Sequence, residues 1–136
     1  MSIDPSLITF AELDKQKGTP YPVTPAGEEY SLPSWYRSVR DVPLNKLQVE
    51  DISRACRQNI HLVHVIPLAL NMLEANPLAG EMYDGELLVS LKAVPTDYWD
   101  AHVNDKLACR AIIEKVVNTL SEDIAADANE LLSYLN

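Results

Sequence analysis

Two stretches of the sequence combine acidic and aromatic side chains in a spacing that favours recognition of a basic partner. The first joins acids to a methionine and a tyrosine, and the second places acids on either side of two neighbouring aromatics. Aromatic anchors surrounded by complementary charge are typical of the residues that carry binding energy in protein interfaces. The predicted binding residues are Glu81, Tyr83, Asp84, Glu86, Asp97, Tyr98, Trp99 and Asp100.

A structural role for the same side chains is the alternative. Aromatic residues bury large apolar areas, so Tyr83, Tyr98 and Trp99 can belong to the core. Acids at helix starts can cap backbone N–H groups and suit the helix dipole. The two stretches also flank one short predicted helix, and a straight helix would hold them at its opposite ends. The sequence therefore leaves open whether they form one surface.

The three histidines are the best candidates for metal ligands in the sequence. His61 and His64 are three residues apart, which places both on one side of a helix. A zinc site needs a third or fourth ligand, and only His102 with its neighbouring aspartates is available to supply one. A metal-dependent enzyme is thus an open hypothesis, but the ligand set is incomplete, and we expect neither a metal nor another cofactor.

Complete catalytic motifs are absent from the sequence. The four glycines form no phosphate-binding loop, and there is no CxxC, HExxH or GxSxG motif. Cys56 and Cys109 fall on the apolar faces of predicted helices, where burial keeps a thiol protonated and unreactive. We therefore expect a binding protein with two reduced cysteines, not an enzyme.

The overall charge narrows the class of partner. The chain of 136 residues has a formal net charge of −9, with 20 acidic and 11 basic side chains. Nucleic acid phosphates and anionic lipid both attract basic proteins, so neither is an expected partner. No basic residue precedes an apolar run at the N-terminus, and the apolar stretch 60–73 is too short and polar to span a bilayer. We expect a cytoplasmic protein.

Charge and proline content divide the single predicted domain, residues 1–136, into two parts. Residues 1–46 have a net charge of −1 and hold six of the nine prolines, whereas residues 47–136 have a net charge of −8. Because proline interrupts helices and central strands, the first part is predicted to be an irregular arm. The second part is predicted to be a compact helical body.

The arm contains two candidates for short helices. Thr9 and Glu12 match a capping box, in which Thr caps backbone N–H groups and Glu reaches back. This pattern predicts a helix over 10–15 that ends before Gly18. Pro33 suits the first position of a second short helix within 32–40.

The body shows helical periodicity throughout. Apolar residues recur at three- and four-residue spacing, and no segment has the clean alternation of a half-buried strand. The predicted helices cover 49–60, 60–74 with a kink or restart at Pro67, 85–93 capped by Asp84, a segment capped by Thr96, 104–120, and a last segment capped by Ser121. The predicted fold is all-α: a compact bundle of about five or six helices with an irregular proline-rich N-terminal arm.

Two segments of the body carry a resemblance to a known family. They read VPLNKLQVEDISRACRQN and VIPLALNMLEANPLAGEMYDGELLVSL, with the most specific cues over 49–59 and 77–88. This pair resembles the immunity proteins of bacterial contact-dependent growth inhibition (CDI) systems. Residues 1–34 of the arm contribute nothing to the resemblance, and the C-terminal helices agree only in length and pattern.

The resemblance implies a cytosolic antidote without catalytic activity. Such a protein would bind the C-terminal toxin domain of a cognate effector as a 1:1 heterodimer and block it. Many toxins of these systems are nucleases with basic clefts, so an RNase is the expected target, and an acidic binder would gain steered association. The resemblance identifies no contact residue. An acidic helical adaptor or chaperone for another effector protein remains the alternative.

Overall fold

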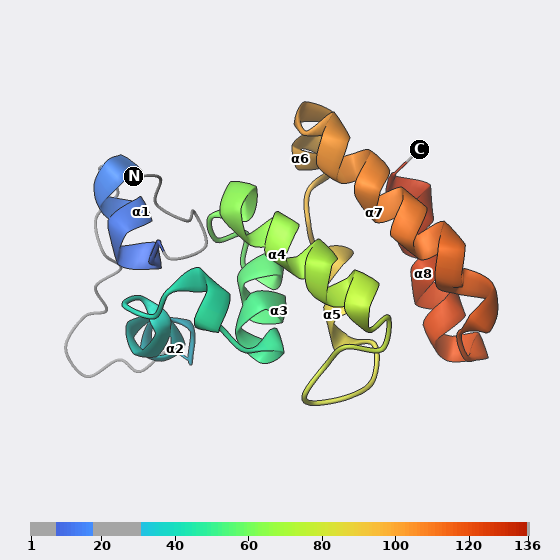
Figure 1. The fold of residues 1–136 in the computed structure, drawn as a ribbon, viewed down its shortest axis with the longest axis horizontal. Helices are drawn as coiled ribbons and strands as arrows, with labels where there is room; N and C mark the ends of the chain where they lie inside the picture. The colour runs from blue at the N-terminus through green and yellow to red at the C-terminus, as the bar shows by residue number, and fades with distance from the viewer. Residues whose placement is uncertain (1–7, 18–30, 136) are drawn as a thin grey trace. The chain divides into compact units, whose positions relative to one another are not determined.

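The computed structural model describes residues 8–17 and 31–135, and every regular element within these ranges is helical (Figure 1). The chain divides into two compact units, Met1–Leu47 and Gln48–Asn136. The predicted all-α class is therefore confirmed. Each unit has its own packing and is described by itself.

The first unit is organised around aromatic side chains. It contains α1 (Phe10–Lys17), α2 (Ser31–Val39) and the short 3₁₀ helix η2 (Leu44–Lys46). The Phe10 ring is buried and stacks on Tyr36, with ring centroids 5.5 Å apart, and the Tyr36 hydroxyl donates a hydrogen bond of 2.7 Å to Asp14 Oδ2. Aromatic packing thus joins two helices that are far apart in the sequence.

Both predicted helices of the arm are present, with one difference in position. The Glu12 N–H donates to Thr9 Oγ1 at 3.2 Å, which is the predicted cap of α1. The second helix begins at Ser31, so Pro33 is its third residue and the prediction of a first helical position is wrong. A proline is still tolerated there, because the N–H groups of the first turn have no partner within a helix.

The second unit is a bundle of six α-helices within the described residues. They are α3 (Val49–Arg57), α4 (Leu62–Ala75), α5 (Glu86–Leu91), α6 (Thr96–Ala101), α7 (Val103–Val116), which continues as the 3₁₀ helix η3 (Val117–Thr119), and α8 (Glu122–Tyr134). Helix α3 packs against α4 and α5, while α7 packs against α4 and α8. Its core is formed mainly by fully buried aliphatic side chains and one tryptophan.

Helix α3 ends earlier, and α4 begins later, than the sequence predicts. Helix α3 ends at Arg57 and α4 begins at Leu62, because Asn59 (φ 56°) and His61 (φ 44°) adopt left-handed backbone conformations that no right-handed helix can contain. Helix α4 then runs through Pro67 without a restart. The missing proline N–H would have bonded the Val63 carbonyl one turn back, and Val63 is exposed.

Two of the three N-caps predicted for the second unit are wrong. The residue before α5 is Gly85, with φ of 86°, and Asp84 lies one position outside the cap. Glycine takes this conformation without the steric cost that a side chain incurs. The residue before α6 is Pro95, so Thr96 is the first residue of that helix. Ser121 precedes α8 as predicted.

Candidate partner-binding surface

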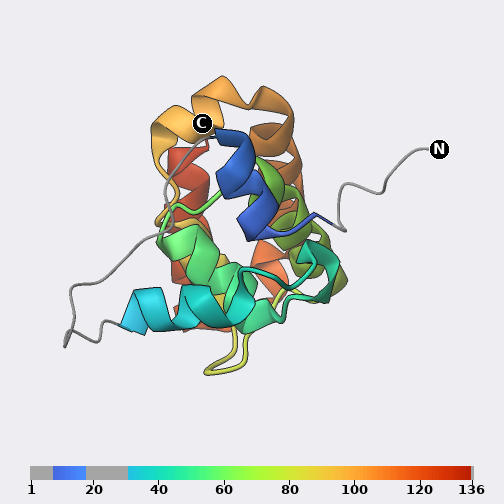
Figure 2. The ribbon, with the colours of Figure 1, turned by 90° about the vertical axis from the view of Figure 1, so that its left-hand side faces the viewer.

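The loop between α4 and α5, residues 76–85, is held in one shape by its own hydrogen bonds. Figures 1 and 2 show it projecting from the helices that it connects. The Gly85 N–H donates to the Leu78 carbonyl and the Leu87 N–H to the Ala79 carbonyl, each at 3.0 Å. The Leu78 N–H also donates to Asn76 Oδ1 at 3.0 Å. These bonds close the base of the loop against the start of α5.

Gly80 allows the two sides of the loop to approach closely. A Cβ atom at this position would lie 2.2 Å from the Tyr83 carbonyl oxygen and 2.7 Å from Glu86 Cβ. Real Cβ atoms do not approach other atoms so closely, so any residue with a side chain would force the loop apart. This loop shape therefore requires glycine at position 80.

Glu86 organises the loop from within, although the sequence predicts it as a binding residue. The residue is 2 % exposed, and its Oε1 accepts hydrogen bonds from the Glu81 N–H at 3.0 Å and the Met82 N–H at 3.3 Å. Its Oε2 lies 3.6 Å from Arg57 Nη1, which donates to Ser90 Oγ at 2.9 Å. The buried carboxylate satisfies two loop N–H groups and has almost no surface exposed to solvent.

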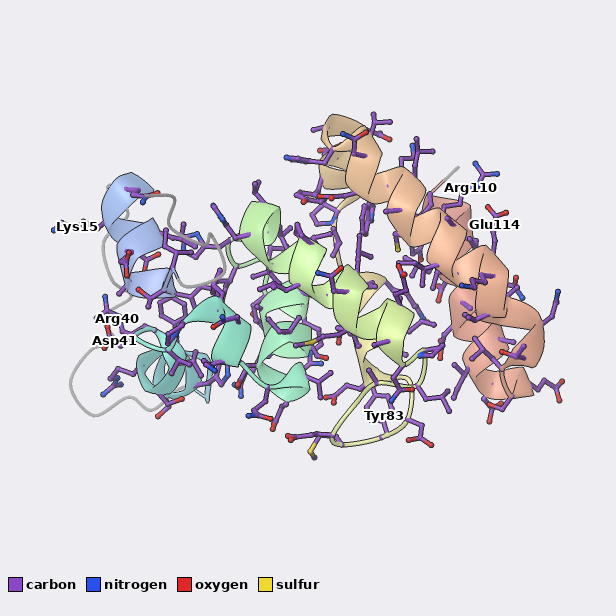
Figure 3. All side chains as sticks on the ribbon, viewed as in Figure 1. Lys15, Arg40, Asp41, Tyr83, Arg110 and Glu114 are labelled. Carbon is purple, nitrogen blue, oxygen red and sulfur yellow. The ribbon has the colours of Figure 1, made fainter. Side chains whose placement is uncertain are left out.

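The tip of the loop presents an apolar pair between two acids. Met82 is 73 % exposed and Tyr83 is 51 % exposed, while Glu81 and Asp84 on either side are also exposed. Figure 3 shows the labelled Tyr83 on this loop. We call Glu81, Met82, Tyr83 and Asp84 the loop tip. Exposed apolar side chains within fixed acidic surroundings are suited to contact with a basic protein surface.

Acids at the start of α3 extend the charge of the loop tip. A hydrogen bond with Glu50 raises the pKa of Glu81, and the negative charges of Glu50, Asp51 and Glu86 act in the same direction. Asp51 also caps α3, because its Oδ2 accepts a hydrogen bond of 3.0 Å from the Gln48 N–H. The sequence shows the Glu50–Asp51 pair, but only the packing of α3 on α5 brings it to the loop.

The second predicted stretch supplies core residues and two exposed acids. Trp99 is fully buried and Tyr98 is 9 % exposed, and the Tyr98 hydroxyl donates to Asp105 Oδ2 at 2.7 Å. Burial and this hydrogen bond raise the pKa of Tyr98. Asp97 and Asp100 are exposed, with Asp100 Oδ1 lying 3.0 Å from Lys106 Nζ. The aromatic pair thus has the structural role that the sequence left as the alternative.

The two stretches do not form one surface in the second unit. Figures 1 and 2 place α6, which carries the second stretch, at the opposite end of the unit from the loop. A further exposed apolar pair, Val103 and Leu107, lies on α7. The same helix carries Arg110 and Glu114, labelled in Figure 3, whose Nε and Oε1 atoms are 2.6 Å apart. This face of α7 therefore has charges of both signs.

The histidines do not form the predicted pair on one helix, because His61 precedes α4 and only His64 lies within it. Within the described residues, no three His, Cys, Asp or Glu side chains gather as a metal site would require. The ring of His102 stacks on Tyr98, with centroids 4.1 Å apart. Cys56 and Cys109 are both free and buried, and burial raises the pKa of each thiol to about 12. Neither cysteine is an available nucleophile.

None of the helices in the described residues has the length and apolar character needed to cross a membrane.

Comparison with known proteins identifies one family. A family model described as CDI immunity proteins matches residues 20–108, about two thirds of the chain. The match includes α3, the loop tip and α5, and it ends within α7. No curated protein matches the chain.

Proposed function

The chain belongs to the CDI immunity protein family, and we propose that it neutralises the C-terminal toxin domain of a cognate CDI effector by covering a basic active-site cleft. Family membership supports immunity against a CDI toxin. The proposal adds that the toxin is a nuclease acting on RNA, that the complex is a 1:1 heterodimer, and that it forms in the cytoplasm. The chain itself would contribute no catalytic step and bind no nucleic acid.

The observation that carries this proposal is the loop tip. Its exposed methionine and tyrosine lie between two exposed acids on a loop whose shape is fixed by the buried Glu86 carboxylate. A loop that is already ordered loses little conformational entropy on binding. Nuclease clefts bind phosphate through Arg and Lys, so the carboxylates would take the place of RNA phosphates there.

The charge of the second unit supports the same partner chemistry. Residues 47–136 carry a net charge of −8, and Glu50 and Asp51 add to the acids of the loop. A negative field of this kind speeds association with a positively charged cleft and disfavours acidic partners. Asp97 and Asp100, at the other end of the unit, stay a prediction that no observation tests.

A neutralisation assay tests the proposed function directly. Purified cognate toxin domain is incubated with RNA while the chain is added in increasing amounts, and the same pair is co-expressed in cells whose growth is followed. We expect RNA cleavage to stop at one equivalent of the chain and growth to be restored. Continued cleavage with excess chain would contradict the proposal, and a partner that binds but stays active would favour the adaptor or chaperone instead.

A further inference from the structure

A notch opens beside the loop, between it and the start of α8. Its walls come from two segments that are far apart in the sequence, and its volume is about 340 Å³. The lining residues are Asn76, Pro77, Leu78, Asp84, Thr119, Leu120, Ser121 and Ile124. Its volume lies at the small end of the ~300–1,000 Å³ range of ligand pockets and is large enough for one side chain of a partner.

The lining of the notch combines an aliphatic wall with one carboxylate. Leu78, Leu120 and Ile124 supply the apolar surface, and Asp84 supplies the charge. The Asp84 carboxylate has no hydrogen-bond or ion-pair partner among the residues that the structure describes. No basic side chain belongs to the lining. Glu122 and Asp123, in the first turn of α8, directly follow the lining residue Ser121. Their negative charges offset the positive end of the helix dipole.

We propose that this notch receives an arginine or lysine side chain of the toxin domain, an inference that rests on the proposed function. The methylene stem of such a side chain would pack along Leu78, Leu120 and Ile124 while its charged end pairs with Asp84. A wholly apolar side chain would remove water from the Asp84 carboxylate without replacing the lost hydrogen bonds. An acidic side chain would meet charge of its own sign.

The position of the notch gives the loop two kinds of contact with one partner. Asp84 lines the notch and also belongs to the loop tip, directly after the exposed Tyr83. A toxin surface that covers Met82 and Tyr83 would therefore bring neighbouring side chains to the mouth of the notch. A charged pair that is shielded from water by adjoining apolar contacts is stronger than one left at the rim of an interface.

The test uses one variant from each wall of the notch and a matched control. The Kd for purified toxin domain is measured with Asp84→Asn, with Leu120→Ala, and with Glu114→Gln, which makes the same charge change on the exposed face of α7. Thermal unfolding checks that Leu120→Ala remains folded. We expect Asp84→Asn and Leu120→Ala each to weaken binding about tenfold or more, which corresponds to ~1.4 kcal/mol, and Glu114→Gln to stay within about twofold.

Double-mutant cycles identify the partner side chain. Each Arg and Lys of the toxin is changed to Gln and measured against wild type and Asp84→Asn. We expect one toxin residue whose loss weakens binding to wild type but not to Asp84→Asn. If the wild-type chain binds toxin and both notch variants bind within about twofold of it, the inference is overturned while the proposed function stands. If the wild-type chain binds no toxin, the proposed function fails and the inference falls with it.

Discussion

Glu86 shows how a single buried acid can define the shape of an exposed loop. Its Oε1 accepts hydrogen bonds from two N–H groups of the loop. Its Oε2 lies near Arg57, which is partly exposed. The two N–H groups belong to Glu81 and to the exposed Met82. The carboxylate therefore fixes the backbone that carries the apolar side chains of the loop tip. Its contribution to binding would come through loop geometry rather than through its charge.

Replacing this carboxylate should destabilise the chain and loosen the loop. Glu86→Ala leaves two backbone N–H groups without their acceptor, so we expect the free energy of unfolding to fall by about 1–3 kcal/mol. Glu86→Gln keeps a carbonyl oxygen for both N–H groups and should cost less. Urea unfolding measures both values, with the exposed Glu81→Ala, expected within about 0.5 kcal/mol of wild type, as control. Equal stability of Glu86→Ala and Glu81→Ala would contradict this role.

The two buried thiols should make the stability of the fold depend on pH above the ordinary pKa of a thiol. The pKa of Cys56 and of Cys109 rises from 9.0 to about 12 in the folded chain because burial disfavours the thiolate. The unfolded chain therefore releases these protons first, so the stabilising contribution is complete below pH 9 and is lost progressively above it. We expect the free energy of unfolding to fall from pH 8 to pH 10. A Cys56→Ala/Cys109→Ala variant should fall less over the same interval, and equal slopes would argue against buried neutral thiols.

At the scale of the elements, periodicity predicted the helices of the second unit but not their exact ends. Apolar spacing recurs every three or four residues wherever a helix packs on one side, so it locates the helix itself. The ends depend on backbone angles that periodicity does not report. Asn59, His61 and Gly85 all have positive φ, a conformation that glycine adopts freely but that Asn and His adopt only in a minority of cases, so these two residue types do not locate a break by themselves.

Only part of the candidate surface could be predicted from the sequence. Asn76-Pro77 correctly predicted the end of α4 and the loop after it, because the residue before a proline disfavours the helical conformation. That the acids and aromatics of 81–86 bind a partner stays a prediction. Burial of Glu86, Tyr98 and Trp99 depends on contacts with residues far away in the sequence, namely Arg57 for Glu86 and the Leu62 carbonyl, which lies 3.3 Å from the Tyr98 hydroxyl. Such contacts leave no local pattern in a single sequence.

The loop as an element depends on Gly80. Gly80→Ala would place a Cβ atom within 2.2 Å of the Tyr83 carbonyl oxygen, so the loop must open. We expect a loss of about 1–3 kcal/mol in the free energy of unfolding, together with faster hydrogen exchange of the Glu81 and Met82 amides. Asp84→Ala, an exposed change in the same loop, serves as the control and should leave exchange unchanged. Unaltered exchange in Gly80→Ala would show that the loop is not held in this shape.

At the scale of the whole chain, the net charge of −9 is concentrated in one part of the sequence. The residues up to 46 contribute −1, and the remaining −8 lies on the part of the chain that contains the loop tip and the notch. The family match covers residues from both parts. A charged body steers a basic partner toward it, while specific affinity comes from the few side chains that the partner buries.

Binding of the toxin domain at the loop tip can be tested directly, because the chain offers a closely matched comparison. Met82→Ser/Tyr83→Ser removes the exposed apolar pair of the loop, and Val103→Ser/Leu107→Ser removes an exposed apolar pair of α7. The measurement is the Kd for purified cognate toxin domain. We predict at least about tenfold weaker binding for the loop variant and a change within about twofold for the α7 variant. Binding that survives the loop changes, or is lost on changing α7, would contradict the account.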